Sequence, residues 1–454
     1  MLDQADEDQA LGNEETLRDD AGYASLARHA ATENGRALIG AVRQQVEDWE
    51  AQHVTRKRKR DSKAPAFARA IEGFVGDLLI AIAHKERAEG SVRRSVGRDA
   101  FTDDVVTYHD FKAIRQALVG LGLVEETPAI FHWNAQSRSA TRFRATAPLI
   151  EMAAAHGVSL LDIGDHSVTN LPKHPLVLKG HSRHAPDGDK IPGGKMKFTF
   201  TERLRAMEQA IIDLNAFIDG FEIRGGTHRG FIRIFNCGDD PAFDWNLGGR
   251  LYSQEGDASY QQMGSAERLK MTIDGKPVRE LDIKASYLTI FHAQEGQPLD
   301  LIAIPDPYRH LELSSTPRDV IKAFITATFG NGRCPRRWAP KTVKSYGEKT
   351  GEDLRRYPIS QVRKAVAKSY PLLAKLRKDS WQAVDGRPPP PIWARLMYLE
   401  SEAIFQTMLA LKDLNIPSLP VHDSLIVTTD HEQTARETLS KLYSDITGAV
   451  PLIP

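Results

Sequence analysis

Cysteine is scarce in this sequence, and long apolar runs are missing. Cys237 and Cys334 are the two cysteines among 454 residues, which excludes a disulfide framework and a cysteine-rich zinc site. No stretch approaches the roughly 18 consecutive apolar residues of a membrane-spanning helix. The first residues are acidic, unlike a secretion signal. These absences predict a protein of a reducing compartment without membrane contact, and we expect a cytoplasmic location.

An excess of positive charge is also lacking. Lys plus Arg and Asp plus Glu both total 60, so any nucleic-acid partner must be inferred from how the charges are distributed. The composition, with 41% apolar and 26% charged residues, is typical of a globular protein. The length predicts about two to four domains.

Residues 1–65 are expected to form an acidic tail, a helix and a basic linker. Residues 1–22 hold eight acids and one Arg, a composition typical of disorder. The basic run TRKRKRDSK at 55–63 fits a solvated linker or a nucleic-acid contact, and the sequence leaves both open.

Residues 66–160 predict a small domain. Apolar residues recur at helical spacing in 67–84 and again in 109–121, and two strands with a polar turn follow. This order of helix, helix and β-hairpin resembles a winged helix. The resemblance implies a second DNA contact through helix 109–121 and the arginines of the hairpin, although a domain for protein contacts is an equal alternative. The arginines are Arg138, Arg142 and Arg144.

The segment 161–197 is rich in Pro, Gly, His and Lys and is expected to be a linker. A long amphipathic helix is then predicted at 201–221, within a segment that spans 198–225.

The stretch LPVHDSLIVT at 419–428 is apolar at both ends and polar at its centre. A buried carboxylate such as Asp423 is costly unless it is paired or binds a metal. A partner lies in KPVRELDIKASYLTIFH at 276–292, where Asp282 ends a predicted strand. Two strands can bring Asp282 and Asp423 to one sheet edge, where they would hold two Mg²⁺ ions roughly 3.5 to 4 Å apart for phosphoryl transfer.

A helix is predicted between these strands, in STPRDVIKAFITATFGNG at 315–332. Thr316 is a plausible N-cap with Pro317 at the first helical position, and Gly330 and Gly332 are stop signals.

One face of this helix carries two cations and a ring. At about 100° per residue, Arg318, Lys322 and Phe329 lie within roughly 40° of one another, while the apolar residues lie on the other face. We expect Arg318 and Lys322 to bind a triphosphate and Phe329 to stack on the base. An ordinary amphipathic helix is the alternative.

Together these segments resemble a polymerase family. LPVHDSLIV is similar to motif C of family A DNA polymerases and of single-subunit phage RNA polymerases, ELDIKASYL resembles motif A, and PRDVIKAFITATFG resembles motif B. GGRLYSQEGDASYQQM at 248–263 and KSYPLLAKLR at 368–377 are similar to further segments of family A. The order of the five segments is that of the family.

The resemblance implies an α+β fold with a right-hand polymerase architecture. The palm, with an antiparallel sheet, would span 226–311 and 392–454, the helical fingers 312–391, and a reduced thumb-like helix 198–225. The helical, winged-helix-like domain would precede them.

The resemblance also implies site residues. Asp282, Asp423 and the backbone carbonyl of Ile283 would bind two Mg²⁺ ions, and Lys322 would neutralise the triphosphate and protonate the leaving pyrophosphate. Nucleic-acid contacts are expected from Arg250, Gln261, Gln262 and His422.

The sequence departs from the family at four positions. Phe329 follows Lys322 by seven residues, where family A normally has eight. Ser424 stands where family A has a third acid, and Glu400 stands near the place of a minor-groove Gln. Tyr287, five residues after Asp282, would collide with a ribose 2′-OH and therefore favours dNTPs, whereas Ser424 is the phage RNA polymerase form.

A basic segment follows the fingers helix, in NGRCPRRWAPKTVKSY at 331–346. Cations beside an aromatic ring predict a template-entry surface. The residues are Arg333, Arg336, Arg337, Trp338 and Lys341.

No exonuclease motif is apparent before the palm. The sequence therefore predicts a magnesium-dependent, exonuclease-less DNA polymerase of DNA replication, with a DNA primer-template and dNTPs as partners. A primase or RNA polymerase on the same palm is an alternative. A DNA-binding regulatory protein with an inactive palm is an alternative of another class.

Overall fold

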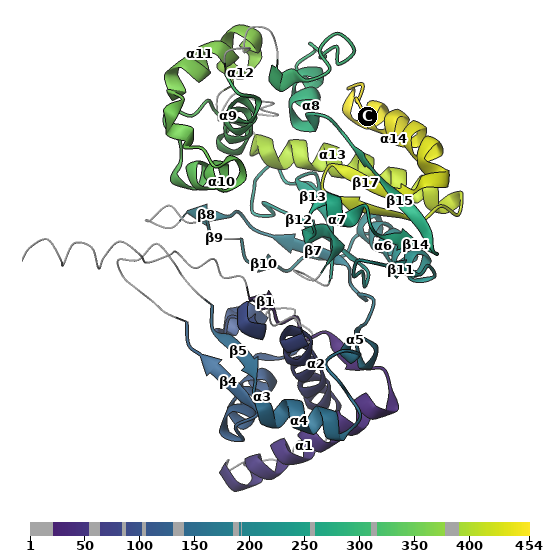
Figure 1. The fold of residues 1–454 in the computed structure, drawn as a ribbon. Helices are drawn as coiled ribbons and strands as arrows, with labels where there is room; N and C mark the ends of the chain where they lie inside the picture. The colour runs from purple at the N-terminus through teal and green to yellow at the C-terminus, as the bar shows by residue number, and fades with distance from the viewer. Residues whose placement is uncertain are drawn as a thin grey trace, which may run out of the picture. The chain divides into compact units, whose positions relative to one another are not determined.

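The computed structural model describes residues 21–53, 64–83, 88–101, 106–129, 140–184, 190–191, 193–254, 259–309, 316–376 and 390–454. These residues form two compact units, one made mainly of the residues up to Asn170 and one that holds nearly all residues from Leu171 to Pro454 (Figure 1). Helices and several separate sheets occur together, so the fold is α+β as predicted. None of the described helices combines the length and apolar character needed to cross a bilayer.

The N-terminal unit contains the two predicted helices and a small sheet. Its main helices are α1 (Glu33–His53), α2 (Ala64–Ala83), α3 (Tyr108–Gly120) and α4 (Ala147–Ala155). Its four-stranded sheet has the order β1 (Gly22–Tyr23), β3 (Ser91–Arg93), β5 (Arg142–Ala145) and β4 (Val124–Thr127). A smaller antiparallel pair joins β2 (Arg28–Ala30) to β6 (Ser167–Thr169), next to the short helix α5 (Ile163–His166).

Aromatic packing joins these elements. Phe74 of α2 lies edge-on to Phe111 of α3 at 5.2 Å and to Phe143 of β5 at 5.4 Å between ring centroids. Each ring is at most 2% exposed, because the apolar residues of both helices recur on one face. The two predicted helices are thus confirmed, and β5 is the described strand of the expected hairpin. The first strand and the turn of that hairpin fall at 130–139, outside the described residues, so the winged-helix assignment and its DNA contact stay predictions.

Some predictions for this unit concern residues that the structure does not describe. Arg138, the basic run 55–63 and the acidic tail up to residue 20 lie outside the described residues. Arg144 is described, and its guanidinium forms an ion pair with Glu125 at 3.0 Å.

A first sheet of the C-terminal unit corrects the predicted linker 161–197. Its order is β10 (Lys195–Met196), β7 (Leu176–Lys179), β12 (Phe231–Phe235) and β13 (Gly248–Ser253), with β7 parallel to β12. Leu176 and Leu178 alternate with more exposed neighbours and are buried, so part of the predicted linker is a strand. The predicted amphipathic helix is confirmed as α6 (Glu202–Asp219).

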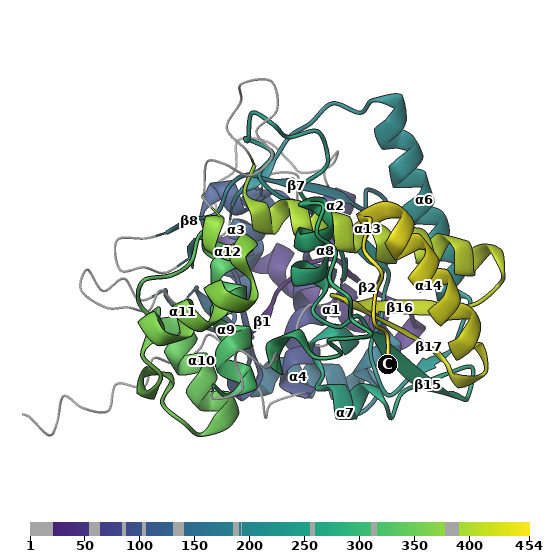
Figure 2. The ribbon, with the colours of Figure 1, turned by 90° about the horizontal axis from the view of Figure 1, so that it is seen from above.

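The second sheet contains both predicted aspartate strands. Its order is β11 (Ile223–Arg224), β14 (Thr272–Ile273), β15 (Lys276–Asp282), β17 (Ser424–Thr428) and β16 (Ser418–Val421), and every pair is antiparallel. In this register Asp282 faces Ser424. The packing helices are α8 (Ser286–Gln294), α13 (Ile392–Asp413) and α14 (Glu432–Thr447), with α13 beside α14 (Figure 2).

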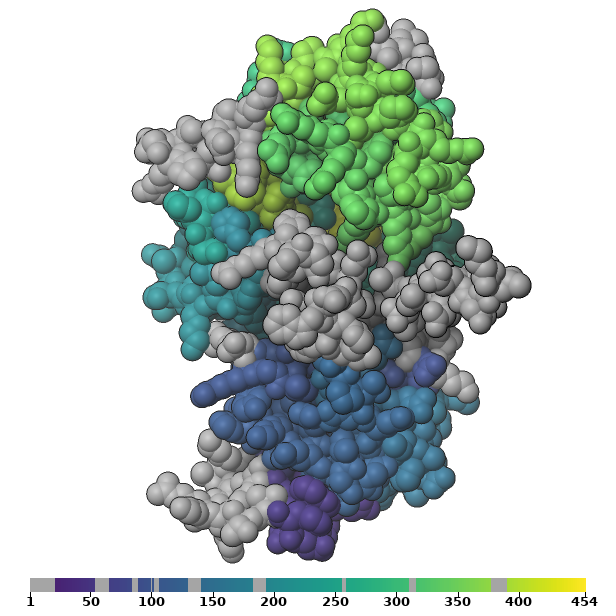
Figure 3. Space-filling view, turned by 90° about the vertical axis from the view of Figure 1, so that its left-hand side faces the viewer, coloured from purple at the N-terminus to yellow at the C-terminus, as the bar shows by residue number. Residues whose placement is uncertain are grey.

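The segment predicted as fingers is helical. It contains α9 (Arg318–Asn331), α10 (Pro340–Thr350), α11 (Ile359–Ser369) and α12 (Pro371–Lys375), drawn in light green as one mass in Figure 3. Two capping predictions are wrong by one or two residues. Pro317 rather than Thr316 occupies the N-cap, and Gly330 lies inside the helix. Gly332, at φ 64°, ends the helix as predicted, because glycine adopts this left-handed conformation without strain.

Candidate functional site

Asp282 and Asp423 lie at the same end of the second sheet. Asp282 is the last residue of β15, and Asp423 stands in the two-residue turn between β16 and β17. His422, at φ 56°, makes this turn and is exposed. The backbone N–H of Ile283 donates to the carbonyl of Asp423 at 3.2 Å. The tight hairpin expected from the polar centre of this stretch is confirmed, and it places the two aspartates side by side.

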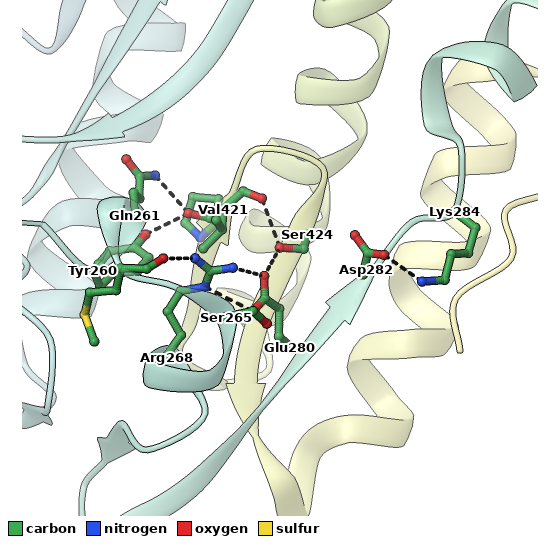
Figure 4. Close-up of polar contacts among 11 residues, drawn as sticks. Tyr260, Gln261, Ser265, Arg268, Glu280, Asp282, Lys284, Val421 and Ser424 are labelled. Atoms are coloured by element: carbon green, nitrogen blue, oxygen red, sulfur yellow. Dashed lines mark hydrogen bonds and ion pairs between the residues drawn. The ribbon is translucent and has the colours of Figure 1, made fainter. Parts of the chain in front are cut away.

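The two carboxylates differ in environment. Burial, followed by the charges of Glu400 and Asp282, raises the pKa of Asp423 to about 7. Asp282 is about half exposed, and its Oδ2 lies 3.1 Å from Nζ of Lys284 (Figure 4). The site therefore concentrates negative charge around Asp423, with Lys284 as a neighbouring counter-charge.

Glu400 of α13 was not expected to join this site. Its side chain is 1% exposed, and its Oε1 lies 2.5 Å from an NH2 nitrogen of Arg250 on β13. Burial opposes the charge of Arg250, but Glu400 outweighs burial and the pKa of Arg250 is raised. The guanidinium predicted to contact nucleic acid is therefore held in an ion pair within the protein.

Glu280 is a second acid that the sequence analysis missed. The Ser424 hydroxyl donates to Glu280 at 2.7 Å, and the Arg268 guanidinium binds the same carboxylate at 2.8 and 3.0 Å (Figure 4). Burial opposes ionisation of Glu280, but the hydrogen bonds of Arg268 and Ser424 outweigh it and lower its pKa. The available signal was strand alternation, because Glu280 lies two residues before Asp282 and shares its face.

Gln261 and Tyr260 bind the hairpin of β16 and β17 through the backbone of β16. Nε2 of Gln261 donates to the carbonyl of Pro420 at 2.8 Å, and the hydroxyl of Tyr260 donates to the same carbonyl at 2.9 Å. Oε1 of Gln261 accepts the N–H of Ser253 at 3.0 Å. Gln261 is 7% exposed and its amide bonds to backbone groups of the protein, so its nucleic-acid contact stays a prediction. Gln262 is exposed, and its contact stays a prediction.

We expect Gln261→Ala to lower the free energy of unfolding by about 1 to 3 kcal/mol, because it leaves the buried N–H of Ser253 without its acceptor. Gln262 is the next residue and its side chain is exposed, so Gln262→Ala should change the free energy of unfolding by less than about 0.5 kcal/mol. Urea denaturation of both variants measures the difference. Equal stabilities of the two would contradict the bracing role.

Helix α9 places its predicted cations outside the core. Nε of Arg318 lies 2.7 Å from Oδ2 of Asp306, and its guanidinium lies 5.2 Å from the ring centre of Tyr308. Lys322, one turn further, is exposed. Both side chains are therefore on the same solvent-facing side of the helix, as predicted.

Phe329 corrects the helical-face prediction. Its ring is 2% exposed and lies edge-on to Tyr287 at 6.3 Å and to Phe291 at 5.5 Å. At about 100° per residue, Phe329 is only roughly 40° from Ile325 of the apolar stripe, so it extends the core face. The expectation that it lies exposed beside the cations is wrong, and its direct neighbour is Tyr287.

The basic segment after α9 is largely exposed. Its exposed cations include Arg333, Arg336, Arg337 and Lys341. Trp338 is partly buried, since its indole N–H donates to the carbonyl of Tyr357 at 2.9 Å and its ring lies edge-on to Phe324 at 6.1 Å. Trp338 thus packs within the helical segment, and base stacking by its ring stays a prediction.

Comparison with known proteins gives little. No family model matches the chain, and no curated protein matches it. One similar solved structure is the POL domain of Pol1 from M. smegmatis in complex with DNA primer-template and dNTP, at 12% sequence identity and a TM-score of 0.21. The match covers 94% of this chain and 67% of that one. A likeness this low transfers neither fold nor activity.

Proposed function

We propose that the protein is a template-directed nucleotidyltransferase, an exonuclease-less DNA polymerase related to family A. The observation that carries the proposal is the juxtaposition of Asp282 and Asp423 at one end of an antiparallel sheet. The order of the motif-like segments, with a cationic helix between the two aspartates, agrees with it. The family assignment itself rests on the sequence resemblance.

The donor set fits Mg²⁺. Among the described residues, no group of three or more His, Cys, Asp or Glu side chains is arranged to hold a metal, but Mg²⁺ takes one or two carboxylates and completes its shell with water and substrate phosphates. Burial, and then the charges of Glu400 and Asp282, raise the pKa of Asp423, and a divalent cation would oppose both effects by favouring the ionised carboxylate. Asp282, Asp423 and the carbonyl of Ile283 would hold the ions, which supply Lewis-acid stabilisation of the attacking and leaving oxygens.

The remaining residues would bind and orient the substrates. Arg318 and Lys322 would bind the triphosphate from one side of α9, with Asp306 fixing the direction of the Arg318 guanidinium. Lys322 would also protonate the departing pyrophosphate. Tyr287, at the start of α8, would lie beside the sugar and exclude a 2′-OH.

The template would lie along the exposed cations after α9. Phosphate contacts are sequence-independent and depend on salt, which suits a polymerase that copies any sequence. His422, exposed in the hairpin turn, would contact the nucleic acid near the growing end.

A single-nucleotide primer-extension assay tests the proposal. We expect the full chain, with Mg²⁺, to extend a DNA primer on a DNA template with dNTPs, and to do so less efficiently with rNTPs because of Tyr287. Extension mainly with rNTPs would instead identify an RNA polymerase or primase. No Mg²⁺-dependent extension on either DNA or RNA templates would refute the proposal and favour a regulatory DNA-binding protein.

A further inference from the structure

Two glutamates stand two residues apart on α13, Glu400 buried and Glu402 partly buried, and each binds an arginine of the first sheet. Glu400 contacts Arg250 at 2.5 Å, and Glu402 contacts Arg233 at 2.5 Å. Burying such a pair is costly, and apolar residues of similar volume often serve stability equally well. The Glu400 pair, next to the aspartate site, therefore calls for a reason beyond stability.

Arg250 connects Glu400 to Tyr287. An NH2 nitrogen of Arg250 lies 3.4 Å from the Tyr287 hydroxyl, and the guanidinium carbon lies 5.9 Å from the centre of the Tyr287 ring. A guanidinium can contact a carboxylate and a hydroxyl at the same time because its planar group carries several N–H donors, whereas an ammonium is a point charge. Glu400 fixes that fork, since its carboxylate is itself 1% exposed and held within α13.

Tyr287 is held from other directions as well. It lies in the first turn of α8, directly after Ala285 and Ser286, and Ala285 has a φ of 50° that sets the entry of the chain into the helix. Phe329 of α9 lies edge-on to its ring at 6.3 Å and in turn packs against Phe291. Burial, and then the nearby charge of Glu400, raise the pKa of Tyr287, so its hydroxyl stays protonated and can accept from Arg250.

We propose that the Glu400–Arg250 ion pair is a positioning device that fixes the ring of Tyr287 and thereby sets the discrimination between deoxyribose and ribose. The inference rests on the proposed function. A ring contacted both by a guanidinium and by Phe329 presents a rigid edge to the sugar. Without the ion pair the ring gains freedom to turn aside, and a 2′-OH is admitted.

Glu400→Gln tests the proposal in single-nucleotide incorporation by the full chain. A displacement of about 1 Å at a reacting group costs on the order of a hundredfold, so we expect the ratio of kcat/KM for a dNTP to that for the matching rNTP to fall by about ten- to a hundredfold. The change should arise mainly from a lower KM for the rNTP. A structural role alone would lower both efficiencies in parallel and leave the ratio unchanged.

Glu402→Gln is the matched control. It breaks the other ion pair of α13, which joins the partly buried Glu402 to the buried Arg233, and Arg233 lies over the rings of Phe235 and Phe405. Thermal melting should show a comparable loss of stability in both variants. The sugar ratio of Glu402→Gln should equal that of the wild type, and a fall equal to that of Glu400→Gln would overturn the proposal.

Two further variants guard against misfolding and indirect effects. Arg250→Lys keeps a charge for Glu400 but loses the fork toward Tyr287, so its ratio should fall in the same direction. In Glu400→Gln combined with Tyr287→Ala, the ratio should equal that of Tyr287→Ala alone, because residues that act through one another are not additive. Additive losses would overturn the proposal.

Failure of the wild type to extend a primer would refute the function itself, whereas wild-type extension with an unchanged ratio in both Glu400→Gln and Arg250→Lys refutes this inference alone.

Discussion

Asp423→Asn is expected to reduce Mg²⁺-dependent nucleotide addition by about 10³-fold or more. Stabilisation by the metal ions is worth several kcal/mol, and each 1.36 kcal/mol is a factor of ten in rate. The amide keeps the size of the side chain and removes the charge that would hold the ions. Single-turnover incorporation at saturating dNTP measures this loss in the chemical step.

Asp430→Asn provides the control for that experiment. Asp430 follows β17 at the other end of that strand, is about 44% exposed and pairs with Lys276 at 2.6 Å, so its loss should leave the rate within about a factor of two, as exposed ion pairs contribute little. Asp282→Asn should resemble Asp423→Asn, and the double variant should lose little more, since groups that act as a unit are not additive. Near-normal extension by Asp423→Asn would contradict two-carboxylate catalysis.

The second large effect concerns stability and pH in the absence of divalent ions. Burial and the charges of Glu400 and Asp282 raise the pKa of Asp423 from 3.8 to about 7. Between these values the folded state binds more protons than the unfolded state, so the free energy of unfolding falls as pH rises. This group alone accounts for a loss of up to about 4 kcal/mol between pH 4 and pH 8.

The variant Asp423→Asn isolates this contribution from those of other acids. Its neutral amide cannot ionise, so we expect equal stability to the wild type near pH 4 and greater stability, by a few kcal/mol, near pH 8 without metal. Saturating Mg²⁺ should stabilise the wild type selectively at pH 8, because a ligand that binds only the folded state stabilises it. Urea denaturation at the two pH values measures the difference, and a pH-independent difference between the two proteins would contradict the raised pKa.

Much of the local structure was determined by the sequence. Apolar periodicity and turn residues predict the strand that ends at Asp282, the hairpin whose turn holds Asp423, and the helices α3, α6 and α9. These signals depend only on residues close together in the sequence. The strand Leu176–Lys179 was missed because it alternates for only four residues within a Pro- and Gly-rich segment.

The partners of the side chains were decided by the tertiary structure. Glu400 meets Arg250 across 150 positions of the chain, and Gln261 meets Pro420 across 159. Helical spacing predicted Phe329 on the face of Arg318 and Lys322, whereas its packing against Tyr287 and Phe291 places it in the core. Sequence periodicity determines which face of a helix or strand is buried. Which side chains contact one another on that face depends on how elements distant in sequence pack. This packing brings the two aspartates together beside the buried ion pair of Glu400 and Arg250.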